Sequence, residues 1–416
     1  MPREGVVAAA RAEERRITLA GFALSAAFLL AAAAAVLLPP AVRLDAWLPL
    51  HLALAGAAGV AIGTLLPFFT AALTASAPAD RRLRAGAVGF LAVGAALVAM
   101  GVAGGLRPMA VAGGITYLVG LAAVGTAAAS PFRRSLSSRG RIVLASDAIA
   151  LGDAIVGVSL ATLFLAGQPD VVGAWPRLLP AHAWLNVLGF LSLMIVSTLL
   201  HLLPTVLGER IVPHRGITVA VVGVALGAPL VALGEVLGSN LLVRGGAIAT
   251  FMGSLGLGAY AFSCWERRGH WTTDAGWHRV SSGRLLAGAA WFVLGAAFAS
   301  GRAIVAGATA AAWALEPLIG PLLVGFVIQI LLGSWVHLLP AIGPGDAARH
   351  ARQRRRLAIA WRLRLVGLNV GAAALTLSLS VAPGAAWADA VTASGLAVLM
   401  LAVAGEGIVL LRSALP

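Results

Sequence analysis

The sequence is poor in charge, contains a single cysteine and has no lysine. Charged residues make up 11% of its 416 positions and apolar residues 60%, with a mean hydropathy of +0.94. This composition lies outside the range of soluble domains and predicts an integral membrane protein. Because Cys264 is the only cysteine, an internal disulfide and a cysteine-rich metal site are excluded. All 30 basic residues are arginine, a bias that we attribute to coding composition rather than to mechanism.

Motifs of several common enzyme classes are also missing. The sequence shows no Ser-His-Asp order, no paired carboxylates of glycosidase type and no His-Glu-x-x-His motif. The glycine-rich run 253–258 lies inside an apolar segment, outside the strand–turn–helix context that a phosphate-binding loop needs. Any chemistry must therefore come from isolated polar residues within the apolar segments.

Twelve apolar segments follow one another along the chain, each near the length of about 20 residues that crosses a bilayer. We interpret all of them as helices, because a chain in lipid must satisfy its backbone hydrogen bonds internally. The first is interpreted as a span rather than a cleaved signal, and residues 1–416 as one transmembrane domain of the all-α class. The predicted spans are 17–39, 46–75, 85–104, 108–130, 142–166, 182–207, 216–236, 241–263, 285–301, 313–340, 365–382 and 388–411.

The arginines predict the orientation of these spans. With the N-terminus in the cytoplasm, 25 of the 30 arginines flank the inner side, as the positive-inside rule requires. The five on the outer side are Arg43, Arg107, Arg177, Arg244 and Arg302. Both termini are then cytoplasmic in a multi-pass protein of the cell membrane. The net charge of +14 is explained by topology and lipid contact, so nucleic acid is not expected as a partner.

Two further features concern the membrane boundary. Ten of the eleven tryptophans, all but Trp291, lie near predicted span ends, where interfacial rings are expected. The cytoplasmic loop 341–364 carries a run of arginines that admits two readings: ordinary positive-inside topology, which we favour, or contact with anionic lipid headgroups.

One sixteen-residue stretch occurs twice, 136 residues apart. Residues 189–204 and 325–340 share Gly, Phe, His, Leu, Leu and Pro at equivalent positions in spans six and ten. Span two carries a fainter copy, in which residues 62–66 align with 196–200 at an offset of 134. These offsets predict three direct four-helix repeats, approximately 17–130, 142–263 and 285–411.

The histidines of the repeated spans lie at two levels. His51 and His182 begin spans two and six at the outer face, whereas His201 and His337 lie near the inner face, just before Pro204 and Pro340, which we expect to end their helices. His182 and His201 are about 28 Å apart along a helix, so two separate pairs are predicted: His51 with His182 and His201 with His337. Imidazole binds haem iron and copper well, which makes all four candidate metal ligands.

The alternative interpretation is that these histidines only cap span ends and bind backbone or lipid. Asn186 follows His182 by one helical turn and is expected to orient that ring as a supporting partner. The remaining histidines are expected to be solvated in cytoplasmic loops. They are His214, His270, His278 and His350.

Carboxylates within a bilayer are costly and are therefore functional candidates. Asp153 is the deepest and is the best single candidate for a proton or cation pathway. Glu235 and Glu316 lie near the outer face and are interpreted as reaching toward the interface. The others in the predicted spans are Asp147 and Glu406.

Spans two and six resemble the haem–copper oxidase subunit I superfamily, in particular its cbb3-type and nitric-oxide-reductase branches and the NnrS-like membrane proteins. The resemblance rests on His182-Ala-Trp184-Leu-Asn-Val-Leu188-Gly189-Phe190, followed by His201-Leu-Leu-Pro204. The run His51-Leu-Ala-Leu-Ala-Gly56 is similar to one in actinobacterial membrane proteins. The resemblance implies twelve helices in three four-helix arcs and b-type haem or copper as cofactor.

This chain departs from that family at several ligand positions. Trp184 stands where the family's His-x-His run has its second histidine, and neither span seven nor residues 313–324 contain histidine. We therefore expect electron transfer, or nitric-oxide or metal handling, rather than oxygen reduction. The alternatives are a proton-coupled secondary transporter that uses Asp153, although a direct repeat is unusual there, and a cofactor-free accessory subunit of other membrane proteins.

Overall fold

The computed structural model describes residues 2–134, 141–270, 277–309, 315–342 and 346–414, and throughout these ranges the regular structure is helical. Within them, twelve helical segments are long and apolar enough to cross a membrane, which confirms the predicted number of spans. They are Arg15–Val36, Trp47–Thr74, Arg81–Ala103, Arg107–Pro131, Arg141–Leu165, Pro169–Leu207, Arg215–Leu237, Asn240–Glu266, His278–Ala306, Glu316–Pro340, Trp361–Val381 and Ala388–Leu410.

The chain divides into two compact units, which are described separately. Unit 1 comprises residues 1–175 with 342–344, and unit 2 comprises residues 176–341 with 345–416. The expected single transmembrane domain stays a prediction. The helices of unit 1 are α1 (Pro2–Val36), α2 (Pro40–Arg43), α3 (Trp47–His51), the π-helix η1 (Leu52–Ala58), α4 (Gly59–Thr74), α5 (Arg81–Ala103), α6 (Arg107–Arg134) and α7 (Arg141–Leu165).

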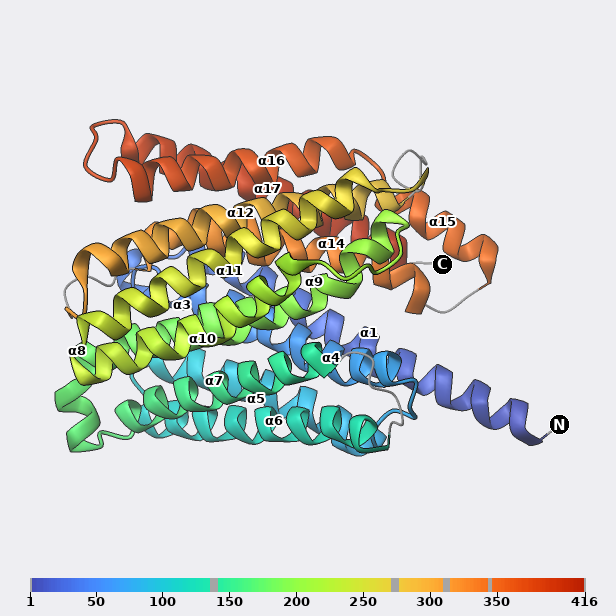
Figure 1. Ribbon diagram of the computed structural model, residues 1–416, viewed down its shortest axis with the longest axis horizontal. Coiled ribbons are helices and arrows are strands. Elements are labelled where there is room, and N and C mark those ends of the chain that lie inside the picture. Colours follow the sequence, from blue (N-terminus) through green and yellow to red (C-terminus); the bar gives the residue numbers. More distant parts are fainter. Residues whose placement is uncertain (1, 135–140, 271–276, 310–314, 343–345, 415–416) are drawn as a thin grey trace. The chain divides into compact units, whose positions relative to one another are not determined.

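Unit 2 begins within α8, and among its described residues α-helices and π-helices continue one another without a break in three stretches, 169–207, 316–342 and 361–381. Its elements are α8 (Pro169–Ala183), η2 (Trp184–Leu191), α9 (Ser192–Leu207), α10 (Arg215–Leu237), α11 (Asn240–Glu266), α12 (Trp277–Ala306), α13 (Glu316–Leu318), η5 (Ile319–Ile328), α14 (Gln329–Ile342), α15 (Ala347–Leu357), α16 (Trp361–Thr376), η6 (Leu377–Val381) and α17 (Ala388–Ala414). Within each unit the long helices lie roughly side by side (Figure 1).

Spans two, six and ten are the most buried helices of the chain. Between 67 and 89% of the most apolar window of each is buried, against 50% or less for the other nine spans. In unit 1, η1 and α4 pack against α1, α5 and α6, and in unit 2, η5 packs against α12 and α16. The three spans that share the repeated sequence are therefore the core helices, which explains why they are apolar on all sides.

Three boundaries differ from the sequence-based expectation. The sixth helix begins at Pro169 rather than at 182, because α8 tolerates Pro176 and Pro180 and runs directly into η2. Pro204 does not end its helix, since α9 continues to Leu207, and α14 likewise passes Pro340 and reaches Ile342. Each proline lacks a backbone N–H donor. The carbonyl oxygen that loses this donor is satisfied by local adjustment of the helix, so the helix continues.

The cytoplasmic loop predicted at 341–364 contains the helix α15. Asp346 caps it by accepting a hydrogen bond from Arg349 N at 2.8 Å, which lowers the pKa of this carboxyl group. Arg356 Nη1 donates to the carbonyl of Arg412 at 2.6 Å, so α15 also satisfies the end of α17. A small apolar cluster beneath it joins four helices through Val280, Val336, Leu357 and Val409.

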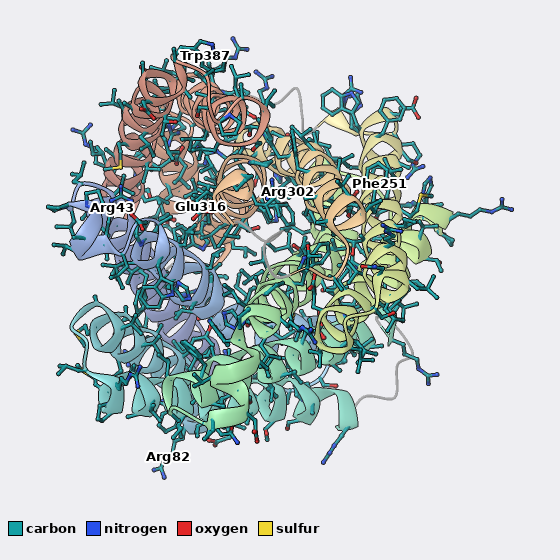
Figure 2. All side chains as sticks on the ribbon, turned by 90° about the vertical axis from the view of Figure 1, so that its left-hand side faces the viewer. Arg43, Arg82, Phe251, Arg302, Glu316 and Trp387 are labelled. Atoms are coloured by element: carbon teal, nitrogen blue, oxygen red, sulfur yellow. The ribbon has the colours of Figure 1, made fainter. Side chains whose placement is uncertain are left out.

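The opposite end of unit 2 carries few charges. Arg302, Glu316 and Trp387 lie at this end, at the termini of α12, α13 and α17, and Trp387 projects from the periphery (Figure 2). Trp387 is 43% exposed, as expected of an indole ring at a membrane interface. The end of unit 2 that carries α15 is thus richer in arginine than the opposite end, as the arginine pattern predicts.

The helices α10 and α11 form a hairpin that is closed by Gly238, whose φ of +67° lies in the left-handed region. The pair approaches closely because glycines face each other. A Cβ added to Gly223 would lie 2.6 Å from the Cα of Gly253, and one on Gly227 would lie 2.8 Å from the carbonyl oxygen of Gly246. Small residues at the contact therefore let the two helices pack closely.

This packing predicts a position-specific effect of alanine. Gly223→Ala forces the hairpin apart and should destabilise the protein by about 1–3 kcal/mol. Gly245→Ala is the matched control, because nothing lies within 4 Å of its added Cβ and alanine favours helix by up to ~1 kcal/mol. Thermal unfolding in detergent measures both, and equal effects would contradict the packing argument.

Candidate functional site

The three core spans each contain a π-helix, which lies near the start of spans two and ten and follows α8 in span six. A π-helix is rare, and it is often found where a helix carries function. An offset of 136 residues maps η2 onto 320–327, inside η5, and an offset of 134 maps η1 onto 186–192, which overlaps most of η2. The same backbone departure thus recurs at corresponding places in spans two, six and ten.

Side-chain hydroxyl groups satisfy carbonyl oxygens of these core spans. Tyr117 OH donates to Ala55 O at 3.1 Å, within η1, and Ser192 Oγ donates to Val187 O at 2.7 Å, within η2. The second of the chain's two tyrosines behaves similarly, since Tyr260 OH donates to Leu200 O at 2.8 Å. Both tyrosines therefore help to fix the core helix of their own unit.

His51 ends α3 and directly precedes η1. Its Nδ1 lies 2.9 Å from the carbonyl oxygen of Trp47, and its ring stacks on the Trp47 indole at a centroid distance of 4.0 Å. Because a carbonyl can only accept, Nδ1 carries the proton and Nε2 carries the lone pair. That tautomer, held by a backbone carbonyl, is the one that a metal-binding imidazole uses.

His182 is held differently. Asn186 Nδ2 donates to His182 O at 2.7 Å and lies 3.2 Å from His182 Nδ1. The carbonyl oxygen of His182 can only accept, so it fixes the side-chain amide of Asn186 with Nδ2 facing the histidine. The same Nδ2 donates to the ring, so Nδ1 of His182 is the acceptor and its Nε2 carries the proton. Asn186 thus contacts His182 as expected, but it favours the tautomer that presents a donor rather than a ligand at Nε2.

At the other end of unit 2, His337 faces a different imidazole from the one expected. Its ring centroid lies 5.8 Å from that of His278, with an interplanar angle of 58°. His278 belongs to α12 and is half-buried, so its assignment to a solvated loop was wrong. His201 is half-buried on α9, and its pairing with His337 stays a prediction.

The assignment of two more loop histidines to bulk solvent is also corrected. His214 caps α10, its Nδ1 accepting a hydrogen bond from Gly216 N at 3.0 Å, and its ring lies 5.9 Å from that of Tyr260. His350 lies on α15 and is half-buried.

Four carboxylates within the described spans are buried, and two of them are not fully satisfied. Asp153 on α7 is 7% exposed, and its Oδ2 has no hydrogen-bond partner among the described residues. Glu235 on α10 is 5% exposed, and its Oε2 likewise lacks a partner in the described part of the chain, so it does not reach toward the interface as expected. Asp147 is also buried, whereas Glu316 is exposed.

Helices α12, α16 and α17 contribute a buried cluster of three charges. Glu406 of α17 accepts hydrogen bonds from Arg284 Nη2 through Oε1 and from Arg364 Nη1 through Oε2, the latter at 2.8 Å. The side chains of Arg284 and Glu406 are 0 and 2% exposed. Because an unpaired charge in this environment would be strongly unfavourable, Glu406 holds α12, α16 and α17 together.

A network of amide groups lies about two helical turns further along α12. Asn369 Oδ1 accepts hydrogen bonds from Trp291 Nε1 at 2.7 Å and from Gln329 Nε2 at 3.1 Å. Gln329 is fully buried, directly after η5. Trp291, the one tryptophan away from predicted span ends, therefore has a polar partner inside the unit.

Together these groups form a polar stripe that winds part of the way around α12, which we define as His278, Ser281, Arg284 and Trp291. Ser281 Oγ donates to Gly333 O, between the histidine pair and the charge cluster. The stripe extends over about 20 Å, thirteen residues at 1.5 Å each. It therefore covers much of a hydrocarbon core of about 30 Å.

The sequence did not reveal this stripe because its members looked ordinary one at a time. Arg284 and Arg364 were assigned to cytoplasmic flanks, whereas α12 and α16 begin earlier than expected and bury both. The available signal was Glu406, a carboxylate inside span twelve that required a cationic partner. Neighbouring antiparallel spans offer such partners at the same depth.

No protein-family model matches this chain, and a search of curated proteins finds no match in sequence. The function must therefore be inferred from the geometry of the residues.

The amide network generates a test of coupling. Asn369→Leu leaves the donors of Trp291 and Gln329 without their acceptor and should destabilise the protein by about 1–3 kcal/mol. The triple variant Asn369→Leu, Gln329→Leu and Trp291→Phe removes all the polar groups and should be no less stable than the single variant. Thermal unfolding measures the stability of both variants. A triple variant whose loss of stability equals the sum of the losses of the three single substitutions would contradict a coupled network.

Proposed function

We propose that this chain is a membrane protein of haem–copper-oxidase-like architecture that binds b-type haem, or copper, through histidine. Its role would be electron transfer or nitric-oxide or metal handling, and not oxygen reduction. The observation that carries the proposal is the His51 imidazole, which is oriented by the carbonyl and ring of Trp47 and lies directly before a π-helix in a buried span.

The three direct repeats are part of this proposal. The repeated sequence, the burial of spans two, six and ten and the register of η1, η2 and η5 all support one four-helix unit used three times. The predicted orientation, with both termini in the cytoplasm of a cell-membrane protein surrounded by lipid, places the π-helices toward the outer face. Other membrane subunits are possible partners under this proposal.

The residues fit the two cofactors unequally. Haem iron needs one or two axial imidazoles, and His51 offers Nε2 as its lone-pair nitrogen. Copper needs more ligands around one point, and the described residues do not bring three His, Cys, Asp or Glu side chains together. His182 fits less well, because Asn186 favours the protonated form of Nε2. Haem is therefore the better-supported cofactor, and when bound it would supply reversible one-electron chemistry.

The role of the chain's own residues at His51 is positioning. The Trp47 carbonyl keeps the proton on Nδ1, and the stacked indole limits rotation of the ring. Tyr117 holds the adjacent π-helix through Ala55. His201 and His337 are proposed as inner ligands on the repeat alone, since His337 instead contacts His278.

A second candidate function has one specific observation in its favour. A proton-coupled secondary transporter needs a carboxylate that can change protonation within the membrane, and the buried Oδ2 of Asp153 lacks a partner among the described residues. In a third reading the chain is a cofactor-free accessory subunit, and neither His51 nor Asp153 then needs a functional role. A purified protein without haem or copper would favour these two readings over the first.

The proposed cofactor is tested by the optical spectrum of the purified protein. Reduction with dithionite should produce haem b bands, and His51→Ala should remove most of them because the imidazole that would hold the haem is lost. His350→Ala is the control, since this histidine lies on α15 outside the spans. The absence of haem bands together with the absence of copper in metal analysis would refute the proposal.

A further inference from the structure

The buried charges of the Arg284–Glu406–Arg364 cluster do not balance. Two guanidinium groups share one carboxylate, so the cluster carries a formal charge of +1. Its side chains are 0, 2 and 6% exposed, in the order Arg284, Glu406 and Arg364. Two other described carboxylates of unit 2 have buried side chains: Glu209 is paired with Arg267, and Glu235 lies on α10, whose helix ends at Leu237, at the opposite end of the unit.

The donors of the cluster are also in excess. Arg284 uses Nη2 for Glu406, while its Nε and Nη1 are buried and have no hydrogen-bond partner among the described residues. Arg364 uses Nη1 for Glu406 and Nη2 for Leu357 O at 2.7 Å, and its Nε is unpartnered within the same part of the chain. Buried guanidinium donors left in this way are unfavourable by several kcal/mol unless an acceptor satisfies them.

One negative ion beside Arg284 would cancel the formal charge and reduce the excess of donors. It would accept a hydrogen bond from Nε or from Nη1, whose N–H bonds point to different sides of the planar guanidinium group, so a single small ion satisfies one of the two. A water molecule could accept hydrogen bonds but would leave the charge uncancelled. The ligand chemistry indicated by the cluster is therefore anionic.

The burial of Arg284 limits the size of the ion. Its side chain has no exposed surface, and its Cβ lies 3.0 Å from where a Cβ of Gly333 would stand, so α12 and α14 are in close contact here. A phosphate group of a lipid or a sulfate ion would be too large for this environment. The arginines of α15, including Arg354 and Arg356, lie at the same end of unit 2 and raise the local concentration of anions.

We propose that unit 2 binds a small monovalent inorganic anion, of the size of chloride, at Arg284 within the Arg284–Glu406–Arg364 cluster. The site is independent of the proposed haem ligand, because it uses other residues and needs no cofactor. Its occupation would stabilise the junction of α12, α16 and α17.

The test measures thermal unfolding of the purified full chain in detergent as gluconate is replaced by chloride at constant ionic strength. The melting temperature should rise with chloride and saturate, as it does for a ligand that binds only the folded state. Arg284→Gln should weaken the apparent affinity by about tenfold to a hundredfold, since hydrogen bonds to charged groups are lost. Arg362→Gln is the matched control, because it removes the same charge from an exposed position on α16 and should leave the response unchanged.

A second variant changes the affinity in the opposite direction. Glu406→Gln removes the competing carboxylate while keeping its shape, so chloride should bind more tightly than in the unmodified protein. Bromide soaked into crystals of the unmodified protein provides a measurement that does not depend on any variant, with an anomalous peak expected beside Arg284 Nε. A melting temperature that does not depend on chloride, or an equal response in Arg284→Gln, would overturn the proposal, as would bromide peaks only elsewhere.

Discussion

The structure depends on one constraint: the interior of a bilayer offers no hydrogen-bond partner to a polar group. Helices meet this demand for most of the backbone. The π-helices of spans two, six and ten relax the regular pattern, and hydroxyl groups such as those of Tyr117 and Ser192 occupy carbonyls that lie within them. The same demand explains why Trp291, Gln329 and Asn369 meet inside unit 2.

Composition predicted the number of spans and their nature because membrane insertion depends on the average apolarity of about 20 residues, which is a local property. The spans that share the repeated sequence, two, six and ten, are also the most buried of the described spans, which was not predicted from the sequence. Their ends were predicted less well. Helix α8 extends the sixth span back to Pro169, and α9 and α14 run past Pro204 and Pro340, because proline near a helix end does not decide where the helix stops.

The candidate site was only partly predictable. Asn186 was expected beside His182 from the spacing of one helical turn, and this contact is present. The partners of His337 and Glu406 could not be found in this way, because they come from helices distant in sequence. His278 lies 59 residues before His337 along the chain, and Arg284 lies 122 residues before Glu406. Tertiary neighbours of this kind follow from helix packing, which hydropathy does not encode.

The histidines and the charge cluster have different physical consequences. At His51 the surrounding groups fix a tautomer and leave the chemistry to a ligand, whereas at Glu406 the surrounding groups nearly complete a set of ion pairs. The first arrangement is suited to binding a cofactor near the start of a core span. The second joins three helices and attracts a counter-ion near the other end of its unit.

The central claim is that one four-helix unit is used three times in one direction, so that spans two, six and ten all begin at the outer face. Labelling of single cysteines in a Cys264→Ser background measures this most directly. The substitutions are Arg43→Cys and Arg302→Cys, which precede spans two and ten, and Arg177→Cys, which lies in the first part of span six; Arg177 and Arg302 are exposed and Arg43 is half-buried. A membrane-impermeant maleimide should label all three in intact cells, and Arg352→Cys only after permeabilisation. Protection of any one of the three until the membrane is opened would contradict the common direction.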